Sequence, residues 1–275
     1  MKEAMKYRKG LWAALLTLTV STAVADTPGP SARTGASSAD QHVPMIVHQR
    51  HGKNVTSTNW SGYAVTGTNG SVTDVKGSWV VPAIQGSCPS TNQYSSSWLG
   101  IDGYSSSTVE QIGTDSDCQN GAPSYYAWFE FYPHPAFIIN SLAVHPGDVM
   151  SAEVNYAGGR FTATLTNATT GQQFSTSAKV GNAKRSSAEW IVEAPWSGGV
   201  LPLADFGTDY FGQNYTFVPS TNTATVGNVT AQIGAFGNSV SQITMVTSSG
   251  VVKALPSALS ADGTSFSDSW LSSGP

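Results

Sequence analysis

The chain has 275 residues, and charged residues make up only 11% of it, far below the typical ~25%. The first 25 residues hold four of the 13 Lys and Arg and one of the 17 Asp and Glu, which leaves 9 basic and 16 acidic residues and a net charge of −7. This charge argues against nucleic-acid binding, which needs a basic surface to neutralise phosphates. A surface with so few carboxylates also has few charged interactions to lose in acid.

The first 25 residues have the layout of a secretory signal peptide. A basic start is followed by an apolar run over residues 11–20 and by small residues at positions 23–25, where cleavage would occur. The apolar run is too short for a membrane anchor, which takes about 20 residues. We therefore expect an exported, extracellular protein that has no membrane contact in its mature form.

Residues 26–52 differ in character from the rest of the chain. They contain three of the five histidines (His42, His48 and His51) together with Pro28, Pro30 and Pro44, and they show no helical or strand periodicity. We interpret this segment as a propeptide or flexible lead-in, which is removed in the active form.

Residues 53–275 are expected to form a single all-β domain. Short β-type runs alternate with Gly, Ser, Asn and Pro, and no amphipathic helix of useful length is present. The runs cover residues 63–66, 75–81, 95–101, 125–132, 149–156, 161–165, 189–193, 223–233 and 242–247. Many short strands with frequent turn signals indicate a sandwich or a barrel, and this length suits one all-β domain.

Strand alternation places aromatic and acidic side chains on one face of three of these runs. The residues are Tyr126, Trp128, Glu130 and Tyr132 in one run, Trp98 and Asp102 in another, and Glu189 and Glu193 in the third. A concave sheet lined in this way could hold an extended peptide or sugar chain. The alternative is the open, solvated face of an ordinary large β protein.

The common catalytic motifs are mostly missing. The sequence has no H-E-x-x-H, no Cys and His cluster at zinc spacing and no G-x-S-x-G, so we expect no metal site. Serine is too abundant for composition to exclude a Ser–His–Asp set, but His134 and His145, the histidines beyond residue 52, each stand beside a proline and indicate turns. Carboxylate chemistry remains, with Asp102, Glu130, Glu189 and Glu193 as candidates.

The two cysteines, Cys88 and Cys118, suggest one disulfide, because an even cysteine count in an exported protein usually means pairing. The bridge would close a loop of about 30 residues, worth roughly 3–4 kcal/mol in the chain-entropy model. Two buried free thiols are the alternative.

Six separated segments in order, from Asn59 to Gly207, resemble the glutamic peptidases, or eqolisins, known from acid-secreting fungi and some bacteria. The segments are Asn59-Trp60-Ser61-Gly62-Tyr63, Trp98-Leu99-Gly100-Ile101-Asp102-Gly103, Gln111-Ile112-Gly113-Thr114-Asp115, Tyr126-Ala127-Trp128-Phe129-Glu130-Phe131-Tyr132-Pro133, Ala188-Glu189-Trp190-Ile191-Val192-Glu193 and Ala204-Asp205-Phe206-Gly207. One segment alone would be weak, but six in order argue against coincidence. The resemblance extends from about residue 59 to residue 246 and is to the bacterial members in particular.

The resemblance implies a function, a site and a fold. It implies an acid endopeptidase that acts on polypeptides without a cofactor, with Gln111 and Glu193 as the catalytic pair. Cleft-lining or supporting roles would fall to Trp98, Asp102, Asp115, Trp128, Glu130 and Glu189. The implied fold is two packed antiparallel sheets, a β-sandwich like that of concanavalin A and the legume lectins, and we expect a monomer. Cys88 and Cys118 lie near the positions of one disulfide in those relatives.

The residue pattern is also compatible with two other functions. One is a carbohydrate-binding lectin with no catalysis, which would not need Gln111 and Glu193 to meet at one small site. The other is a glycosidase, which needs two carboxylates about 5–9.5 Å apart across the sugar and hence a carboxylate where Gln111 stands.

Overall fold

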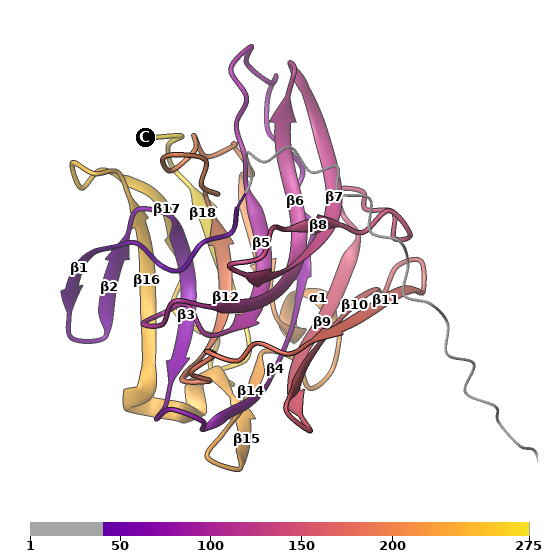
Figure 1. Ribbon diagram of the computed structural model, residues 1–275. Coiled ribbons are helices and arrows are strands. Elements are labelled where there is room, and N and C mark those ends of the chain that lie inside the picture. The colour runs from indigo at the N-terminus through magenta and orange to yellow at the C-terminus, as the bar shows by residue number, and fades with distance from the viewer. Residues whose placement is uncertain (1–40, 275) are drawn as a thin grey trace, which may run out of the picture.

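The computed structural model describes residues 41–274, which fold into two packed β-sheets (Figure 1). The first sheet has the order β1 (Val47–His51), β2 (Asn54–Ser57), β16 (Val240–Val246), β3 (Trp60–Thr66), β12 (Ser187–Glu193), β5 (Ser96–Ile101), β6 (Val109–Gln119), β7 (Ala122–Tyr132) and β8 (Phe137–Ile138). All neighbours are antiparallel except β2 and β16. The predicted all-β sandwich is confirmed.

The second sheet lies behind the first. It has the order β11 (Gln172–Ala178), β10 (Arg160–Asn167), β9 (Val149–Ala157), β4 (Val72–Val80), β13 (Thr208–Phe211), β18 (Phe266–Trp270) and β17 (Val252–Pro256). The hairpin of β14 (Thr223–Val226) and β15 (Val229–Gln232) also pairs with β4, and β17 joins β16, so the two sheets are continuous at that edge. Two short helices, α1 (Gln213–Thr216) and η1 (Ile233–Ser239), complete the elements.

The hairpin corrects one prediction, because residues 223–233 had been expected to form a single strand. Gly227 and Asn228 both have positive φ, 58° and 66°, and they link Val226 to Val229 by a two-residue turn. Such turns need residues that tolerate the left-handed region, and Gly and Asn are the usual choices. The sequence therefore carried the turn signal within a run that otherwise has β-type residues.

The main core lies between the sheets, where alternate side chains of each strand point inward. Leu99, Ile112 and Trp190 of the first sheet pack in one buried cluster with Trp79 and Phe161 of the second. The opposite face of the first sheet carries a second, smaller cluster that includes Trp60, Trp98, Trp128 and Ile191. Because this second face is also covered, every residue of β5 and β12 is buried.

The described part of the lead-in differs from the irregular segment expected from the sequence. Residues 47–51 form β1 and pair with β2, so a domain boundary at residue 53 would cut a hairpin. Residues 41–46, which we call the strap, cross the outer face of the first sheet and form the isolated bridge Gln41–Trp196. The predicted signal peptide, residues 1–25, lies outside the described residues.

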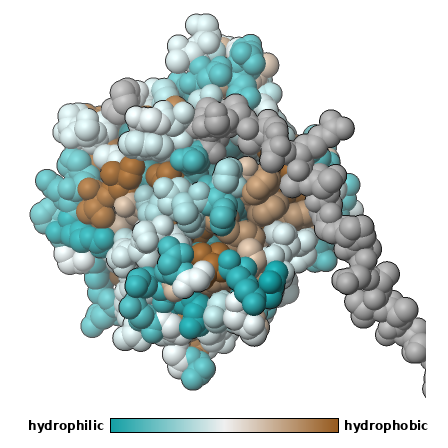
Figure 2. All heavy atoms as spheres, in the orientation of Figure 1, coloured by the Kyte–Doolittle hydropathy of each residue, from teal (hydrophilic) through white to brown (hydrophobic). Residues whose placement is uncertain are grey.

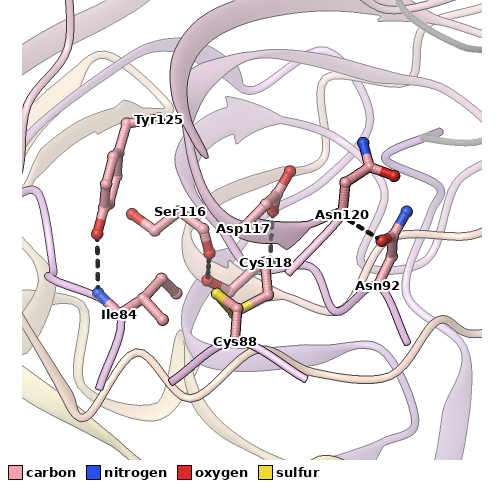
Figure 3. The surroundings of a disulfide bond; sticks show 9 residues. Ile84, Cys88, Asn92, Ser116, Asp117, Cys118, Asn120 and Tyr125 are labelled. Atoms are coloured by element: carbon pink, nitrogen blue, oxygen red, sulfur yellow. Dashed lines mark hydrogen bonds between the residues drawn. A yellow bond between two sulfur atoms is a disulfide. The ribbon is translucent and has the colours of Figure 1, made fainter. Parts of the chain in front are cut away.

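The disulfide between Cys88 and Cys118 is present, and it fastens the loop after β4 to the end of β6 (Figure 3). Hydrogen bonds reinforce the same junction: Ile84 N donates to Tyr125 Oη over 3.0 Å, and Asn120 N donates to Asn92 Oδ1 over 2.9 Å. The bridge braces the far end of the strand that carries Gln111.

Removing this disulfide should weaken the fold. The double variant Cys88→Ala/Cys118→Ala is expected to lose about 3–4 kcal/mol of unfolding free energy, because the cross-link spans 30 residues and limits the unfolded chain. Denaturant unfolding of the variant and the oxidised wild type at one pH would measure the loss. Equal midpoints and slopes would show that the disulfide adds nothing.

No helix within residues 41–274 is long and apolar enough to cross a bilayer. The face in Figure 2 is mostly hydrophilic or neutral, with apolar atoms in small separate patches.

Candidate active site

The floor of the candidate site is set by strand register. Gln111 on β6 lies directly opposite Gly100 on β5 and Glu130 on β7, so all three share the outer face of the first sheet. Gly100 must lack a side chain, because a Cβ there would come 3.0 Å from Gln111 Cβ and 2.8 Å from the Glu110 carbonyl oxygen. This close approach lets Gln111 and the Trp98 ring lie against the sheet.

Glu193 ends β12 and is fully buried on the same face. Its Oε2 accepts a hydrogen bond from Trp98 Nε1 over 2.9 Å, and its Oε1 accepts one from Asn59 Nδ2 over 3.3 Å. Burial raises the pKa of the Glu193 carboxyl well above its usual range, and the nearby charge of Glu130 raises it further. The hydrogen bonds from its neighbours oppose that shift only in part.

Gln111 and Glu130 form a hydrogen-bonded pair in the site. Gln111 Nε2 donates to Glu130 Oε2 over 3.1 Å, and Gln111 Oε1 has no hydrogen-bond partner among the described residues. Burial raises the pKa of Glu130 well above its usual range, although hydrogen bonds from the His42 N–H and Gln111 oppose the shift. The contact fixes which way the Gln111 N–H groups point.

The strap contacts both Gln111 and Glu193. Gln111 Nε2 donates to the His42 carbonyl oxygen over 2.6 Å, and His42 Nδ1 lies 3.6 Å from Glu193 Oε2. The His42 N–H donates to Glu130 Oε2 over 3.0 Å. His42 therefore contacts all three polar side chains, through its backbone and through its ring.

Trp128 supplies an aromatic platform beside these polar groups. The His42 ring stacks on it, with the ring centroids 3.5 Å apart and the planes inclined by 3°. Trp128 Nε1 donates to Asp115 Oδ1 over 2.6 Å, which holds the indole in place. Trp98, Trp128, Glu130 and Asp115 thus all lie in or directly behind the site.

Two of the residues singled out in the sequence, Asp102 and Glu189, make no hydrogen bond to Gln111 or Glu193. Asp102 has a φ of 74° and accepts hydrogen bonds from the Arg185 N–H over 2.6 Å and the Ser186 N–H over 2.9 Å, so it fastens a loop. Burial raises the pKa of Glu189 well above its usual range, with smaller contributions from the charges of Asp102 and Glu110. The structure gives Glu189 no hydrogen bond to Gln111 or Glu193.

Three residues in the site were not among the candidates. Asn59 and Trp60 stand in the first of the six segments, and both donate to the Val43 carbonyl oxygen, over 3.3 Å and 3.1 Å. Their motif was a signal that reasoning from the residues could have used. His42 had none, because nothing in the sequence shows that a lead-in residue reaches a site whose members lie as far along the chain as Glu193.

Within residues 41–274 no group of three or more His, Cys, Asp or Glu side chains is placed to hold a metal ion. The site instead offers two side-chain amides, three carboxyls and indole donors around a peptide backbone. These groups can exchange protons and donate hydrogen bonds to a carbonyl oxygen.

Comparison with known proteins identifies the family. The model of the Peptidase A4 family matches residues 58–254, which is most of the chain. The chain belongs to this family. Aspergillopepsin-2 of Aspergillus niger is similar to this chain, with 31% identity over 179 residues. That match covers 56% of this chain and 62% of the length of the Aspergillus protein.

Solved structures agree with the fold. The scytalido-glutamic peptidase bound to a transition-state analogue inhibitor superposes with a TM-score of 0.63 at 24% identity, covering 78% of this chain and 98% of that one. The aspergilloglutamic peptidase from Aspergillus niger gives a TM-score of 0.55 at 28% identity, covering 65% of this chain and 99% of that one. The resemblance to the glutamic peptidases is therefore confirmed at the level of family and fold.

Proposed function

We propose that this Peptidase A4 protein is a secreted endopeptidase that hydrolyses polypeptides in acid with Glu193 and Gln111, and that it resembles the bacterial members of the family. The observation that carries the proposal is the peptide carbonyl of His42 held by Gln111 Nε2 at 2.6 Å, while Nδ1 of the same residue lies 3.6 Å from the Glu193 carboxyl. The names of the similar proteins, all peptidases, support the same reaction class.

Amide hydrolysis needs an activated water, a stabilised oxyanion and a protonated leaving nitrogen. Glu193 as carboxylate takes a proton from water, and the water oxygen bonds to the carbonyl carbon. Gln111 Nε2 donates to the oxyanion, a contribution of about 3–4 kcal/mol by analogy with single oxyanion-hole donors. The C–N bond then breaks as Glu193 passes its proton to the leaving nitrogen. No cofactor enters any step.

Neighbouring groups serve this reaction by position. Glu130 accepts from Gln111 Nε2 and orients it, and Gln111 Oε1 remains able to accept a hydrogen bond from the attacking water. Trp98 Nε1 and Asn59 Nδ2 fix the two oxygens of Glu193. Trp128 and Asp115 form the hydrogen-bonded aromatic platform beside these groups, and we place Asp102 and Glu189 in the supporting structure.

The maturation scheme follows from the sequence. We propose that residues 1–25 are removed on export, that residues 26–52 are a propeptide lost in acid, with β1 separating from β2, and that the mature domain acts as a monomer. The burial of His42 across Gln111 and Glu193 supports the second step, because a substrate cannot occupy the same space.

Digestion of denatured casein at pH 3.5 and at pH 7 tests the function. We expect fragments only in acid, and we expect Gln111→Ala to lower turnover by about 10²–10³, the usual effect of one missing oxyanion donor. Circular dichroism should show the variant folded. Equal digestion at both pH values, or a folded Gln111→Ala protein with wild-type turnover, would refute the proposal.

A further inference from the structure

The outer face of the second sheet, away from the candidate active site, carries a polar groove. Its larger part is a hollow of about 560 Å³ over β4 and the β14–β15 hairpin. A smaller hollow of about 270 Å³ lies over β9 and β10. Both hollows have Lys76, Ser220 and Thr221 in their walls, so they form one depression, which we call the hydroxyl groove.

Strand register places the floor of the hydroxyl groove on this outer face. Val75 of β4 packs in the core between the sheets, so its neighbours Asp74 and Lys76 point the other way. Their register partners on β14 are Thr225 and Thr223. The backbone of β4 is paired with β9 on one side and with β14 on the other. A ligand here must therefore be recognised by side chains, and a peptide could not bind by adding a strand.

The side chains around the larger hollow are those that pair with hydroxyl groups. Among the described residues that line it, only Ala231 lacks a polar side chain. The hydroxyl side chains are those of Ser220, Thr221, Thr223, Thr225, Thr230 and Thr264. A hydroxyl both donates and accepts hydrogen bonds, and so does each hydroxyl of a sugar. The lining thus matches a ligand rich in hydroxyl groups.

The charged side chains of the groove are paired or hydrogen-bonded within the protein. Lys76 Nζ lies 3.5 Å from Glu153 Oε1, and Asp262 accepts a hydrogen bond from Ser260 of its own turn. Burial, helped by a hydrogen bond and by the charge of Glu153, raises the pKa of Asp74 to about 6, so that carboxyl is neutral in acid. A groove with so little free charge suits an uncharged ligand better than a phosphate or a basic peptide.

Two features of residues 217–221 point to a ligand. Thr221 is 2% exposed, and its hydroxyl has no hydrogen-bond partner among the described residues, although buried polar groups normally have one. Phe217 is 87% exposed, has a φ of 58° and directly precedes Val218 in the wall of the smaller hollow. A disfavoured backbone conformation held in a folded protein is a reason to look for a function. An exposed aromatic ring offers a flat apolar surface on which the C–H face of a sugar ring can stack.

We propose that the hydroxyl groove binds an uncharged oligosaccharide, with the threonine hydroxyls as hydrogen-bond partners and Phe217 as the stacking surface. The groove lies on the second sheet, whereas Gln111 and Glu193 lie on the outer face of the first. A glycan in the groove therefore leaves the candidate active site free and anchors the protein to a glycan-bearing surface or substrate. This binding does not depend on the proposed peptidase function, because the two sites share no residue.

An array of neutral oligosaccharides, with charged glycans and peptides as further spots, tests the inference when probed with the labelled full chain at pH 5. We expect binding to a neutral glycan, whose affinity is then measured by calorimetry. Thr223→Val/Thr225→Val keeps the shape of both side chains but removes two hydroxyls, so the affinity should fall by about tenfold or more. Phe217→Ala removes the stacking surface and should weaken binding by a similar factor.

Thr162→Val is the matched control. Thr162 stands on the same face of β10, two residues before Thr164, but outside both hollows. Its affinity for the glycan should equal that of wild type. Circular dichroism should show all variants folded, and their hydrolysis of a fluorogenic peptide in acid should match that of wild type.

Three results would overturn the inference: no binding to any neutral glycan, binding only to charged glycans or peptides, or wild-type affinity in both groove variants. The proposed peptidase function would stand in each case. Absence of peptide hydrolysis by wild type would instead refute that function and leave the glycan measurement unaffected.

Discussion

Glu193→Gln is expected to abolish peptide hydrolysis while leaving the fold intact. The amide keeps the shape of the side chain and can still accept hydrogen from Trp98 or Asn59, but it cannot take a proton from water. General-base catalysis typically raises a rate by about 10²–10⁴-fold. Turnover on casein in acid should therefore fall by at least about 10²-fold. Acid proteolysis by the purified variant, with circular dichroism as the check on folding, measures the effect.

Glu189→Gln is the matched control for this prediction. Glu189 stands on the same strand and the same face, four residues earlier, but it makes no hydrogen bond to Gln111 or Glu193. A glutamine keeps the size of that side chain, so activity should stay close to wild type. Should a folded Glu193→Gln protein cut casein at the wild-type rate, the assignment of the base is wrong, and Glu189 and Glu130 become the candidates.

The faces of the strands could be predicted because side chains in a strand alternate with a period of two. That rule placed Trp98, Trp128 and Glu130 on one face, and strand register shows that they share it with Glu193. It could not say which strands are neighbours. The pairing of β12 with β5 joins residues about 90 positions apart, and only the resemblance to a family assigned Gln111 to the site.

Strand β6 was not predicted from the alternation of apolar and polar residues, because both of its faces are covered. It carries Glu110, Gln111, Asp115 and Asp117, all buried, where alternation of apolar and polar residues would normally reveal a strand. On one face of such a strand the polar residues belong to the candidate site or hold its side chains in place. On the other face they pack against neighbouring residues. A strand that carries site residues was therefore not among the predicted β runs.

The ordered path of the strap across the site was the other feature that could not be predicted from the sequence. Its histidines and prolines indicated irregular structure, and residues 41–46 indeed form no regular strand. What the pattern could not show is that an irregular segment can be ordered by contacts with side chains far away in sequence, here Gln111, Glu130 and Asn59. Each contact uses the strap backbone, which carries no sequence signal.

Carboxyls buried between the two sheets make the fold itself sensitive to pH. Asp209 on β13 and Asp268 on β18 are direct register partners and are both fully buried, and Ser97 of the first sheet donates a hydrogen bond to Asp209. Burial raises the pKa of Asp209 to about 7 and the pKa of Asp268 well above its usual range. Burial also raises the pKa of Glu110 on β6 to about 9.

The free energy of unfolding is therefore expected to fall as pH rises from about 4 to 7. In this window the native state holds these protons and the unfolded chain does not, so each such group removes about 1.4 kcal/mol per pH unit. For Asp209 alone, whose pKa moves from 3.8 to about 7, the loss by pH 7 is about 4 kcal/mol. The stability is fully present below pH ~4, where both states are protonated.

Denaturant midpoints at pH 4, 5, 6 and 7 would measure this slope. Asp209→Asn removes one titrating group while keeping the size of the side chain and a partner for Ser97, so its midpoint should fall less steeply with pH than that of wild type. Asp262→Asn is the control: Asp262 is exposed, and hydrogen bonds led by that from Ser260 lower its pKa to about 2, so it does not titrate in this window. Its slope should equal that of wild type, and a wild-type midpoint that rises from pH 4 to pH 7 would contradict the buried-carboxyl account.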